Sequence, residues 1–402
     1  LQITNYKLRI TKMKYNFDEF VDRSHTDTVK SGRLKQLFGR EDLIPLWVAD
    51  MDFLCPPAVT EALKERVEHG LFGYTMPSQA YYDSILGWLK RRHQWKVKQE
   101  YLTYVPGVVK AFAFAMDVFT QKGDGVIIQP PVYHPFRLVT QALGRKVIHN
   151  PLLLQDGRYR IDFDGLECLL KTTDCKMLLF CNPHNPGGRV WSPDELKKLA
   201  ALCHAYRVLV VSDEIHGDMA FPGYRHTPFA TVSPEAEQNS ITLMAPSKTF
   251  NIAGIVSSFA VVPNPKIRQL YFDYLEAREL NDGTVFAYTA TRAAYEQGDE
   301  WLKEMMQYVE QNVSLVDGFF KEHIPQIKVM IPQASFLVWL DCRELGLTQK
   351  ELVDLFVNKA RLALNDGTMF GREGEGFMRM NVGTPRSVIE TALNNLKKAC
   401  KA

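Results

Sequence analysis

Three polar side chains follow three apolar runs of the chain, each near the point where a strand is expected to end. Asn182 and Asp213 stand at the ends of two such runs, and Lys248 comes shortly after a third. In a doubly wound sheet the carboxyl ends of the parallel strands meet at one edge, and ligands bind in the crevice beyond it. We therefore expect an amide, a carboxylate and a lysine amine to converge on one site.

One cofactor needs this set of groups. Pyridoxal phosphate (PLP) is held by a lysine Schiff base, and its ring nitrogen pairs with a carboxylate. Because the carboxylate keeps that nitrogen protonated, the ring accepts the electron pair of a substrate carbanion. We expect Lys248 to hold PLP and to serve as the catalytic base, Asp213 to pair with the ring nitrogen, and Asn182 to donate a hydrogen bond to the phenolate oxygen.

The other parts of such a cofactor also have candidate contacts. An aromatic ring covers the open face of the cofactor, and Tyr133 in the sequence PPVYHPF is the candidate. A phosphate binds backbone N–H groups at a helix N-terminus, and Val108 and Val109 open an expected helix after Pro106-Gly107. Ser247, next to the lysine, is a further candidate phosphate contact.

Short β-rich runs alternate with helical patterns in the middle of the chain. Runs with continuous apolar character predict strands that are buried on both faces. We expect them at 125–129, 146–150, 176–181, 208–212, 241–245 and 257–262. Helices are expected from near 109 to 119 and from 193 to about 206, the latter after an N-cap Ser192 with Pro193 at the first helical position. This alternation predicts a mostly parallel, doubly wound α/β sheet.

The pattern changes after about residue 285. Two long helices (286–297 and 300–322), a hairpin-like region (328–330 and 335–341) and two further helices (349–360 and 387–398) are expected there. The first fifty-odd residues form no sheet by themselves. We therefore predict a large domain over 55–285 and a smaller α+β domain formed from 1–54 and 286–402.

Composition excludes several classes of protein. The chain has 402 residues, 46% hydrophobic and 23% charged, and 48 Lys and Arg oppose 46 Asp and Glu for a net charge of +2. Near-neutral charge gives no bulk electrostatic reason to bind nucleic acid or an anionic membrane. The apolar runs are strand-sized, whereas a membrane-spanning helix needs about 20 apolar residues.

The seven cysteines are scattered, with no CxxC and no zinc-finger spacing to histidine, so we expect free thiols, no metal site and a cytoplasmic location. The N-terminus shows no export signal. Met13-Lys14-Tyr15 looks like a natural beginning, which suggests that residues 1–12 are an upstream extension.

Several longer motifs resemble those of the fold type I PLP-dependent aminotransferase superfamily, class I/II. They are NPHNPGG at 182–188, SDEIH at 212–216, APSKTFNIAG at 245–254 and Arg379 in FMRMNVGTPR. The resemblance implies a PLP-bound homodimer, with Arg379 binding the substrate carboxylate. It also implies that Tyr74, in FGYTMP, reaches across the interface to the phosphate of the neighbouring subunit.

Within that superfamily the chain resembles the cystathionine β-lyase-like C–S lyases. PLWVADMDF at 45–53 looks like their signature, and its Trp47 is expected at the substrate site. His216, expected to contact the cofactor, stands where most aminotransferases of this class carry Tyr. Val256 departs from the general pattern, because those enzymes usually carry a phosphate-binding Arg there. Lys110, Ser247 and helix-end amides are then left to meet the phosphate charge.

The resemblance implies a C–S β-lyase that cleaves L-cystathionine, L-cysteine or related S-conjugates to a thiol, pyruvate and ammonia. One alternative is an aminotransferase, which uses the same residues but needs a keto-acid acceptor. A second alternative is a regulatory protein-binding role on the same fold, which nothing in the sequence excludes. The sequence does not identify the preferred sulfur amino acid.

Overall fold

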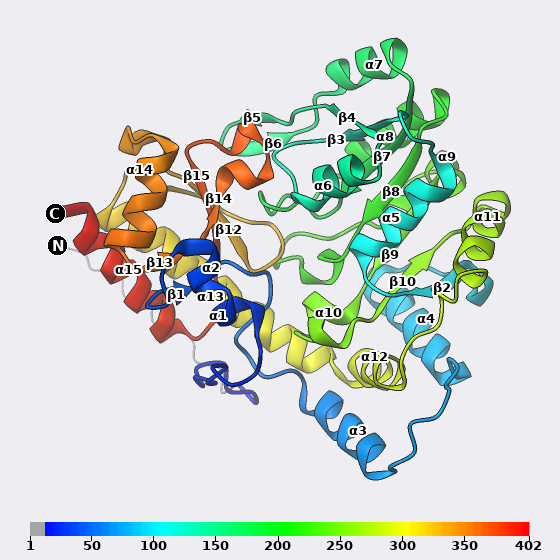
Figure 1. Cartoon of the computed structure of the whole chain (residues 1–402), viewed down its shortest axis with the longest axis horizontal. Coiled ribbons are helices and arrows are strands. Elements are labelled where there is room, and N and C mark those ends of the chain that lie inside the picture. The colour runs from blue at the N-terminus through cyan, green and yellow to red at the C-terminus, as the bar shows by residue number, and fades with distance from the viewer. Residues whose placement is uncertain (1–12, 402) are drawn as a thin grey trace.

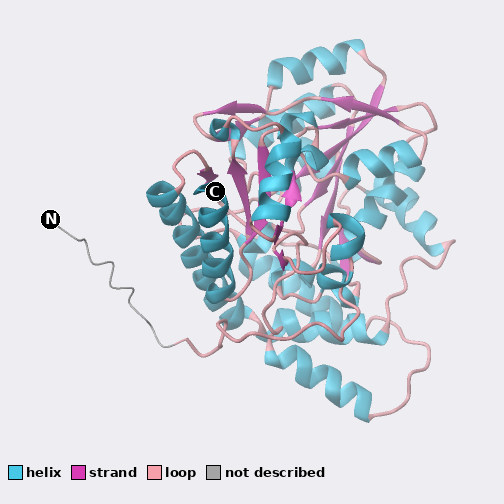
Figure 2. Ribbon diagram, turned by 60° about the vertical axis from the view of Figure 1, so that its left-hand side comes forward, coloured by secondary structure: helices cyan, strands magenta, loops and turns pink. Residues whose placement is uncertain are grey.

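The computed structural model describes residues 13–401, so the expected upstream extension at 1–12 lies outside the described residues. A central sheet carries helices on both faces, and a smaller sheet lies beside it, close to the C-terminus (Figures 1 and 2). The predicted α/β fold class is confirmed. None of the helices within 13–401 combines the length and the apolarity that a membrane crossing requires.

The central sheet has seven strands in the order β2-β10-β9-β8-β7-β3-β4. Five are parallel, and β10 pairs antiparallel with both β9 and β2. Every position of β3, β8 and β9 is buried, and so is every position of β7 except Lys176, as their continuous apolar character predicted. Their bounds are β2 Leu102–Val105, β3 Gly125–Ile128, β4 Lys146–His149, β7 Cys175–Cys181, β8 Leu209–Asp213, β9 Ser240–Met244 and β10 Ser258–Val261. The sequence pattern missed β2.

Helices cover the sheet from both sides because side chains alternate along each strand. Leu178 and Phe180 of β7 pack into one apolar cluster with α7 and α8, while Met177 and Leu179 pack into another with α5, α6 and α11. Ser192 caps α8 through a reciprocal bond with Glu195, which confirms the predicted start. The bounds are α5 Val108–Phe119, α6 Pro135–Ala142, α7 Phe163–Thr172, α8 Pro193–Ala205, α9 Pro234–Gln238 and α11 Pro265–Glu276. A hairpin, β5 Leu153–Gln155 and β6 Arg158–Arg160, lies between β4 and α7.

The registers of β8 with its neighbours bring the site residues to one edge of the sheet. Cys181 at the end of β7 pairs with Asp213 at the end of β8, and Asp213 pairs with Leu243 of β9. The short helix α10, Pro246–Thr249, begins two residues after β9 and carries Lys248. The predicted convergence of Asp213 and Lys248 therefore follows from strand pairing.

The second, smaller sheet is antiparallel, in the order β11-β12-β15-β14. The expected hairpin is present as β11 and β12, whereas β15, which holds Arg379 at its centre, was not predicted. The helix expected over 349–360 is α14 followed by a π-helical turn at Leu355–Lys359. The bounds are β11 Lys328–Met330, β12 Leu337–Asp341, β14 Asn365–Asp366, β15 Phe377–Asn381, α13 Asp299–His323, α14 Gln349–Asp354 and α15 Arg386–Lys401.

The N-terminal part of the described chain packs against elements from its C-terminal part. Strand β1, Ile44–Pro45, pairs in parallel with β13, Leu362–Ala363, and the short helices α1, Val29–Gly32, and α2, Leu34–Phe38, precede it. Helices α3, Pro57–Glu68, and α4, Gln79–His93, then pack against α12, Val285–Gln297. The division of the chain at residues 54 and 285 stays a prediction.

Candidate active site

A cavity of about 290 Å³ opens at the carboxyl edge of the central sheet. Its wall comes from the N-terminus of α5, the ends of β7 and β8, the α10 turn and the start of β10. Seven of the residues predicted from the sequence line it: Val108, Val109, Tyr133, Asp213, His216, Ser247 and Lys248. Segments more than 100 residues apart in the sequence are thus brought to one place.

Lys248 is placed by the turn that follows β9. Its Nζ donates a 2.6 Å hydrogen bond to the carbonyl of Ala49, which belongs to the WVADM segment. Burial lowers the pKa of this amine, and the positive charge of Arg379 also lowers it, while Asp50 opposes the change. The low pKa favours the neutral amine, which is the form that attacks a carbonyl group and accepts a proton.

Asp213, the last residue of β8, is a buried carboxylate in the wall of the same cavity. One carboxylate oxygen accepts a 3.1 Å hydrogen bond from the backbone N–H of Ile215, and the side chain has no ion-pair partner within residues 13–401. Burial raises the pKa of Asp213 to about 7, although the nearby Lys248 charge acts in the opposite direction. A buried carboxylate in this position is suited to a protonated ring nitrogen, which supplies the missing positive charge.

The first turn of α5 offers free backbone donors to an anion. No side chain caps this helix, and its first internal bond runs from the N–H of Ala111 to the carbonyl of Gly107. The N–H groups of residues 108–110 are therefore left for a ligand. Gly107 adopts φ 109°, a conformation that L residues rarely take, so glycine is needed for the chain to enter the helix here.

Val256, which stands where the resemblance led us to expect a phosphate-binding arginine, lines the cavity. It has φ 56° and ψ 58°, which is an outlier for a β-branched residue. The hydroxyl of Tyr104 donates a 2.8 Å hydrogen bond to its carbonyl. No cation stands at this position, so the helix donors, Ser247 and Lys110, which all line the cavity, are the groups available to a phosphate.

Arg379 is a buried cation with no carboxylate partner among the described residues. Its Nη1 donates to Oδ1 of Asn185 (3.0 Å), and its Nη2 donates to Oδ1 of Asn365 (2.6 Å) and to the carbonyl of Trp47 (2.9 Å). Its Nε has no partner, and no carboxylate lies within ion-pair distance of it in the described part of the chain. Burial lowers the pKa of Arg379 to about 10. The site is therefore prepared for an incoming carboxylate.

The structure corrects the prediction for Asn182. Its side chain does not line the cavity, because its Nδ2 donates to Glu214 (3.3 Å) and to the carbonyl of Thr227 (3.2 Å). Its backbone N–H still bonds to Asp213, so Asn182 continues the sheet and its side chain is held within it. Asn185, in the second Asn-Pro pair of NPHNPGG, reaches the cavity after the chain has turned. The second Asn-Pro pair of the motif was the sequence signal that could have identified Asn185 as a candidate site residue.

The side chain of Trp47, a residue expected at the substrate site, does not line the cavity. Its indole Nε1 donates a 2.8 Å hydrogen bond to the carbonyl of Lys30, and its ring packs edge-on against Phe38, 5.6 Å between centroids. Only the backbone carbonyl faces the site, where it accepts from Arg379. The sequence did not predict that the carbonyls of Trp47 and Ala49 accept hydrogen bonds at the site, because every residue has a backbone carbonyl whatever its side chain.

Three further predicted residues differ in their surroundings. His216 is buried at the cavity wall, its Nδ1 has no hydrogen-bond partner, and burial lowers its pKa to about 3, so the ring is neutral. Tyr133 lines the same cavity with a pKa that burial raises. Tyr74 lies elsewhere, on the extended segment before α4, and its side chain is fully exposed.

Taken together, these groups fit PLP. The cavity presents a lysine amine, an unpaired buried carboxylate and a helix N-terminus with free donors. An aromatic residue and a neutral histidine complete the wall. By contrast, no group of three or more His, Cys, Asp or Glu side chains in residues 13–401 has an arrangement that could hold a metal ion.

Comparison with known proteins agrees with this assignment. The family model for aminotransferase class I and II matches residues 41–396. The cystathionine β-lyase PatB of Bacillus subtilis is 45% identical, over 96% of this chain and 99% of its own length. Cystalysin of Treponema denticola, solved with pyridoxal 5′-phosphate, has a TM-score of 0.93 and 37% identity, covering 97% of this chain and 99% of its own.

The PLP-bound C–S lyase of Staphylococcus hominis has a TM-score of 0.90 and 32% identity, again over 97% of this chain and 99% of its own. Each of these three proteins thus matches this chain over nearly its full length. The chain belongs to the PLP-dependent aminotransferase class I and II family, in the branch that includes these cystathionine β-lyases and C–S lyases.

Proposed function

We propose that this protein is a PLP-dependent C–S β-lyase that cleaves L-cystathionine or related S-conjugates of L-cysteine. The products are a thiol, pyruvate and ammonia. The observation that carries the proposal is the cavity in which Lys248, Asp213 and the N-terminus of α5 converge beside the unpaired Arg379. The names of PatB and of the S. hominis enzyme, a cystathionine β-lyase and a C–S lyase, support the same reaction.

Arg379 determines how the substrate is oriented. Its guanidinium group, held at three points by Trp47, Asn185 and Asn365, keeps a fixed direction while its Nε stays free. A substrate α-carboxylate supplies the missing negative charge and can accept a charge-assisted hydrogen bond from the free Nε–H. The bound carboxylate directs the substrate Cα–H bond toward Lys248.

Lys248 moves the proton. When bound, PLP supplies an electron sink for the pair that is left on the substrate Cα, and Asp213 pairs with its ring nitrogen. Burial lowers the pKa of Lys248, which favours the neutral amine, the form that accepts the Cα proton. The Cβ–S bond then breaks, the thiolate leaves with the bonding pair and takes up a proton, and water converts the remaining aminoacrylate to pyruvate and ammonia.

The experiment that tests the function is a search for thiol and pyruvate released from L-cystathionine with no keto acid present. A lyase needs only the one substrate. An aminotransferase, represented among the relatives by archaeal aspartate aminotransferases at 25% identity, needs a second substrate to regenerate its cofactor. An obligatory keto acid together with no thiol from any cysteine conjugate would establish the aminotransferase reaction in its place.

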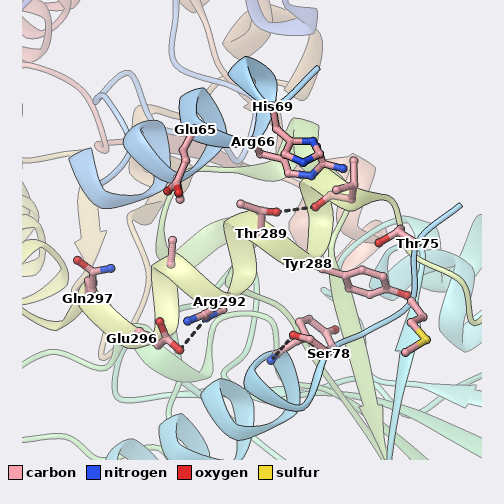
Figure 3. Close-up of a pocket in the computed structure, with 15 residues that line it drawn as sticks. Glu65, Arg66, His69, Thr75, Ser78, Tyr288, Thr289, Arg292, Glu296 and Gln297 are labelled. Carbon is pink, nitrogen blue, oxygen red and sulfur yellow. Dashed lines mark hydrogen bonds and ion pairs between the residues drawn. The ribbon is translucent and has the colours of Figure 1, made fainter. Parts of the chain in front are cut away.

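We also propose that the active unit is a homodimer. Large apolar side chains are exposed along the segment before α4: Leu71, Phe72, Tyr74 and Met76. The same segment borders a pocket of about 620 Å³ between α3 and α12, whose lining residues are drawn in Figure 3. A second copy of the chain that covers this region buries those side chains and lets Tyr74 reach the phosphate of its partner.

The proposed location is the cytoplasm. All seven cysteines are free thiols, and four of them, Cys175, Cys181, Cys203 and Cys342, are buried. Thiols persist in reducing compartments. Fractionation of the host cell with an antibody to the protein tests this assignment, and recovery from the medium would contradict it.

A further inference from the structure

A buried carboxylate outside the cavity, Asp218, contacts the segment that carries Lys248. It lies in the turn Gly217–Met219, two residues after His216, and is 3% exposed. The Oγ1 of Thr249, the residue that follows Lys248, donates a 2.8 Å hydrogen bond to Oδ2 of Asp218. Nothing in the reaction proposed above uses Asp218.

The other oxygen of Asp218 is held by two residues from the C-terminal part of α4. Trp88 Nε1 and His93 Nε2 each lie 2.8 Å from Oδ1, and both donate to it because a carboxylate only accepts. Arg92 Nη2 also donates to the Asp218 carbonyl, at 2.6 Å. Four donors from two segments therefore fix this carboxylate and its backbone.

Trp88 itself cannot move freely. Its ring stacks on Tyr295 of α12, with 5.0 Å between centroids, and meets Phe250 of the lysine segment edge-on at 5.5 Å. Both rings are fully buried. The α4 end of the network is thus part of a packed core, and a bond to it gives the lysine turn a rigid support.

Three segments meet at Asp218: α4, the turn that follows Asp213 at the end of β8, and the α10 turn that bears Lys248. Burying an anion is costly unless it is fully hydrogen-bonded, and apolar residues often fill such a place at no loss of stability. One of the hydrogen bonds to Asp218 comes from Thr249, the residue next to the catalytic lysine. That choice of partner indicates a task at the active site.

We propose that Asp218 is a positioning residue that fixes the Lys248 turn against the segment carrying Asp213 and His216. Through Thr249 it keeps the lysine amine at a constant place in the cavity, where it meets the cofactor and the substrate Cα. The inference rests on the proposed function for the reaction, but the placement of Lys248 also governs how quickly the cofactor attaches.

Two substitutions of Thr249 separate the hydroxyl group from the side-chain volume. Thr249→Val keeps the shape and loses the bond to Asp218, whereas Thr249→Ser keeps the bond and loses a methyl group. Thr140→Val is the matched control, because Thr140 is equally buried and its hydroxyl donates to the carbonyl of Phe136 within α6 and to Sδ of Met116 on α5, not to the segment that carries Lys248. Each protein is measured in two ways: covalent attachment of PLP to cofactor-free protein, and steady-state cleavage of L-cystathionine.

For Thr249→Val we expect attachment to slow and kcat to fall by about 10-fold, with KM within about threefold, since a small misplacement of a reacting group is costly while Arg379 still binds the substrate. Thr249→Ser and Thr140→Val should stay near the wild type. Equal losses in the Val and Ser variants, or wild-type attachment and kcat in Thr249→Val, would overturn the proposal.

The two measurements keep the proposals apart. If the wild type attaches PLP but releases no thiol from any cysteine conjugate, the lyase reaction fails while the attachment rates still test the role of Asp218. If the wild type is an active lyase and the attachment rates of the variants do not differ, the positioning role alone is contradicted.

Discussion

Lys248 and Ala49 are joined by a 2.6 Å hydrogen bond from the lysine amine to the backbone carbonyl, although 199 residues separate them in the chain. The carbonyl holds the amine inside the cavity before any ligand arrives. The carbonyl accepts a hydrogen bond from the amine and donates none, so it leaves the nitrogen lone pair free to attack a carbonyl carbon. The segment around Ala49 is therefore part of the active site through its backbone.

Removal of the lysine amine should abolish both cofactor attachment and turnover. Lys248→Ala should be colourless after dialysis, whereas the wild type should be yellow, and borohydride should link the cofactor to Lys248 alone. Absorbance spectra and peptide mapping measure this. Lys266→Ala, an exposed lysine at the start of α11, is the control and should remain yellow and active. An active, colourless wild type would refute the assignment of the cofactor.

Asp213 should make the stability of the cofactor-free protein depend on pH. Its folded pKa, about 7, lies above the unfolded value of 3.8, so the folded state binds the proton more tightly. The contribution of the group is fully present below about pH 4 and is lost as the pH rises through 7. Asp213→Asn cannot ionise and escapes this loss.

The measurement is therefore the difference in Tm between cofactor-free Asp213→Asn and cofactor-free wild type. It should grow in favour of the variant between about pH 4 and 7 and level off above that. The same variant should lose most of its activity when loaded with PLP, because the ring nitrogen is no longer held protonated. A Tm difference that stays constant from pH 4 to 8 would count against a buried, unpaired carboxylate.

Arg379 should govern substrate binding more than cofactor binding. Hydrogen bonds to charged groups contribute about 1.5–3 kcal/mol, so Arg379→Gln should raise KM for L-cystathionine by about 10- to 100-fold. The KM of Arg379→Lys should lie between those of the wild type and Arg379→Gln, because lysine keeps the charge but loses the fixed geometry of the guanidinium donors. PLP absorbance should persist in both variants. Unchanged KM in Arg379→Gln would place the α-carboxylate elsewhere.

The proposed dimer predicts that two inactive variants complement each other. A Lys248→Ala subunit retains Tyr74, and a Tyr74→Phe subunit retains Lys248. If Tyr74 acts in the site of the partner, the mixed dimer contains one site with both residues intact. Co-expression with two different tags, purification of the mixed species and a pyruvate assay measure this. A mixed dimer no more active than its weaker parent, or an active monomer by light scattering, would contradict the interface.

The sequence predicted the central sheet well because burial on both faces leaves a continuous apolar run. The strands β3, β7, β8 and β9 are of this kind. The same approach missed β2, whose run LTYV is short and partly polar, and β15, where Met and Arg alternate around the buried Arg379. An arginine within a run of residues normally indicates an exposed position, so the burial of β15 could be recognised only from the hydrogen-bond partners of Arg379 in the structure.

Site residues at strand ends were predicted to the extent that the end of the strand was placed correctly. Asp213 closes β8 and faces the cavity, whereas Asn182 continues the sheet by one residue and turns its side chain to Glu214. A difference of three residues, from Asn182 to Asn185, lies within the uncertainty of any boundary taken from sequence. The roles of the Trp47 and Ala49 carbonyls depend on tertiary packing alone.

The contact between Lys248 and Ala49 depends on a strand close to the C-terminal end of the fold. The segment that presents the Ala49 carbonyl is held from both sides by Asn381 of β15, whose Nδ2 donates to the carbonyls of Val48 and Asp50. A nascent chain on the ribosome therefore contains Lys248 long before the strand that places its acceptor has been translated. The finished pocket exists only when the C-terminal strand has docked, so loading of the cofactor is expected to follow release of the full-length chain.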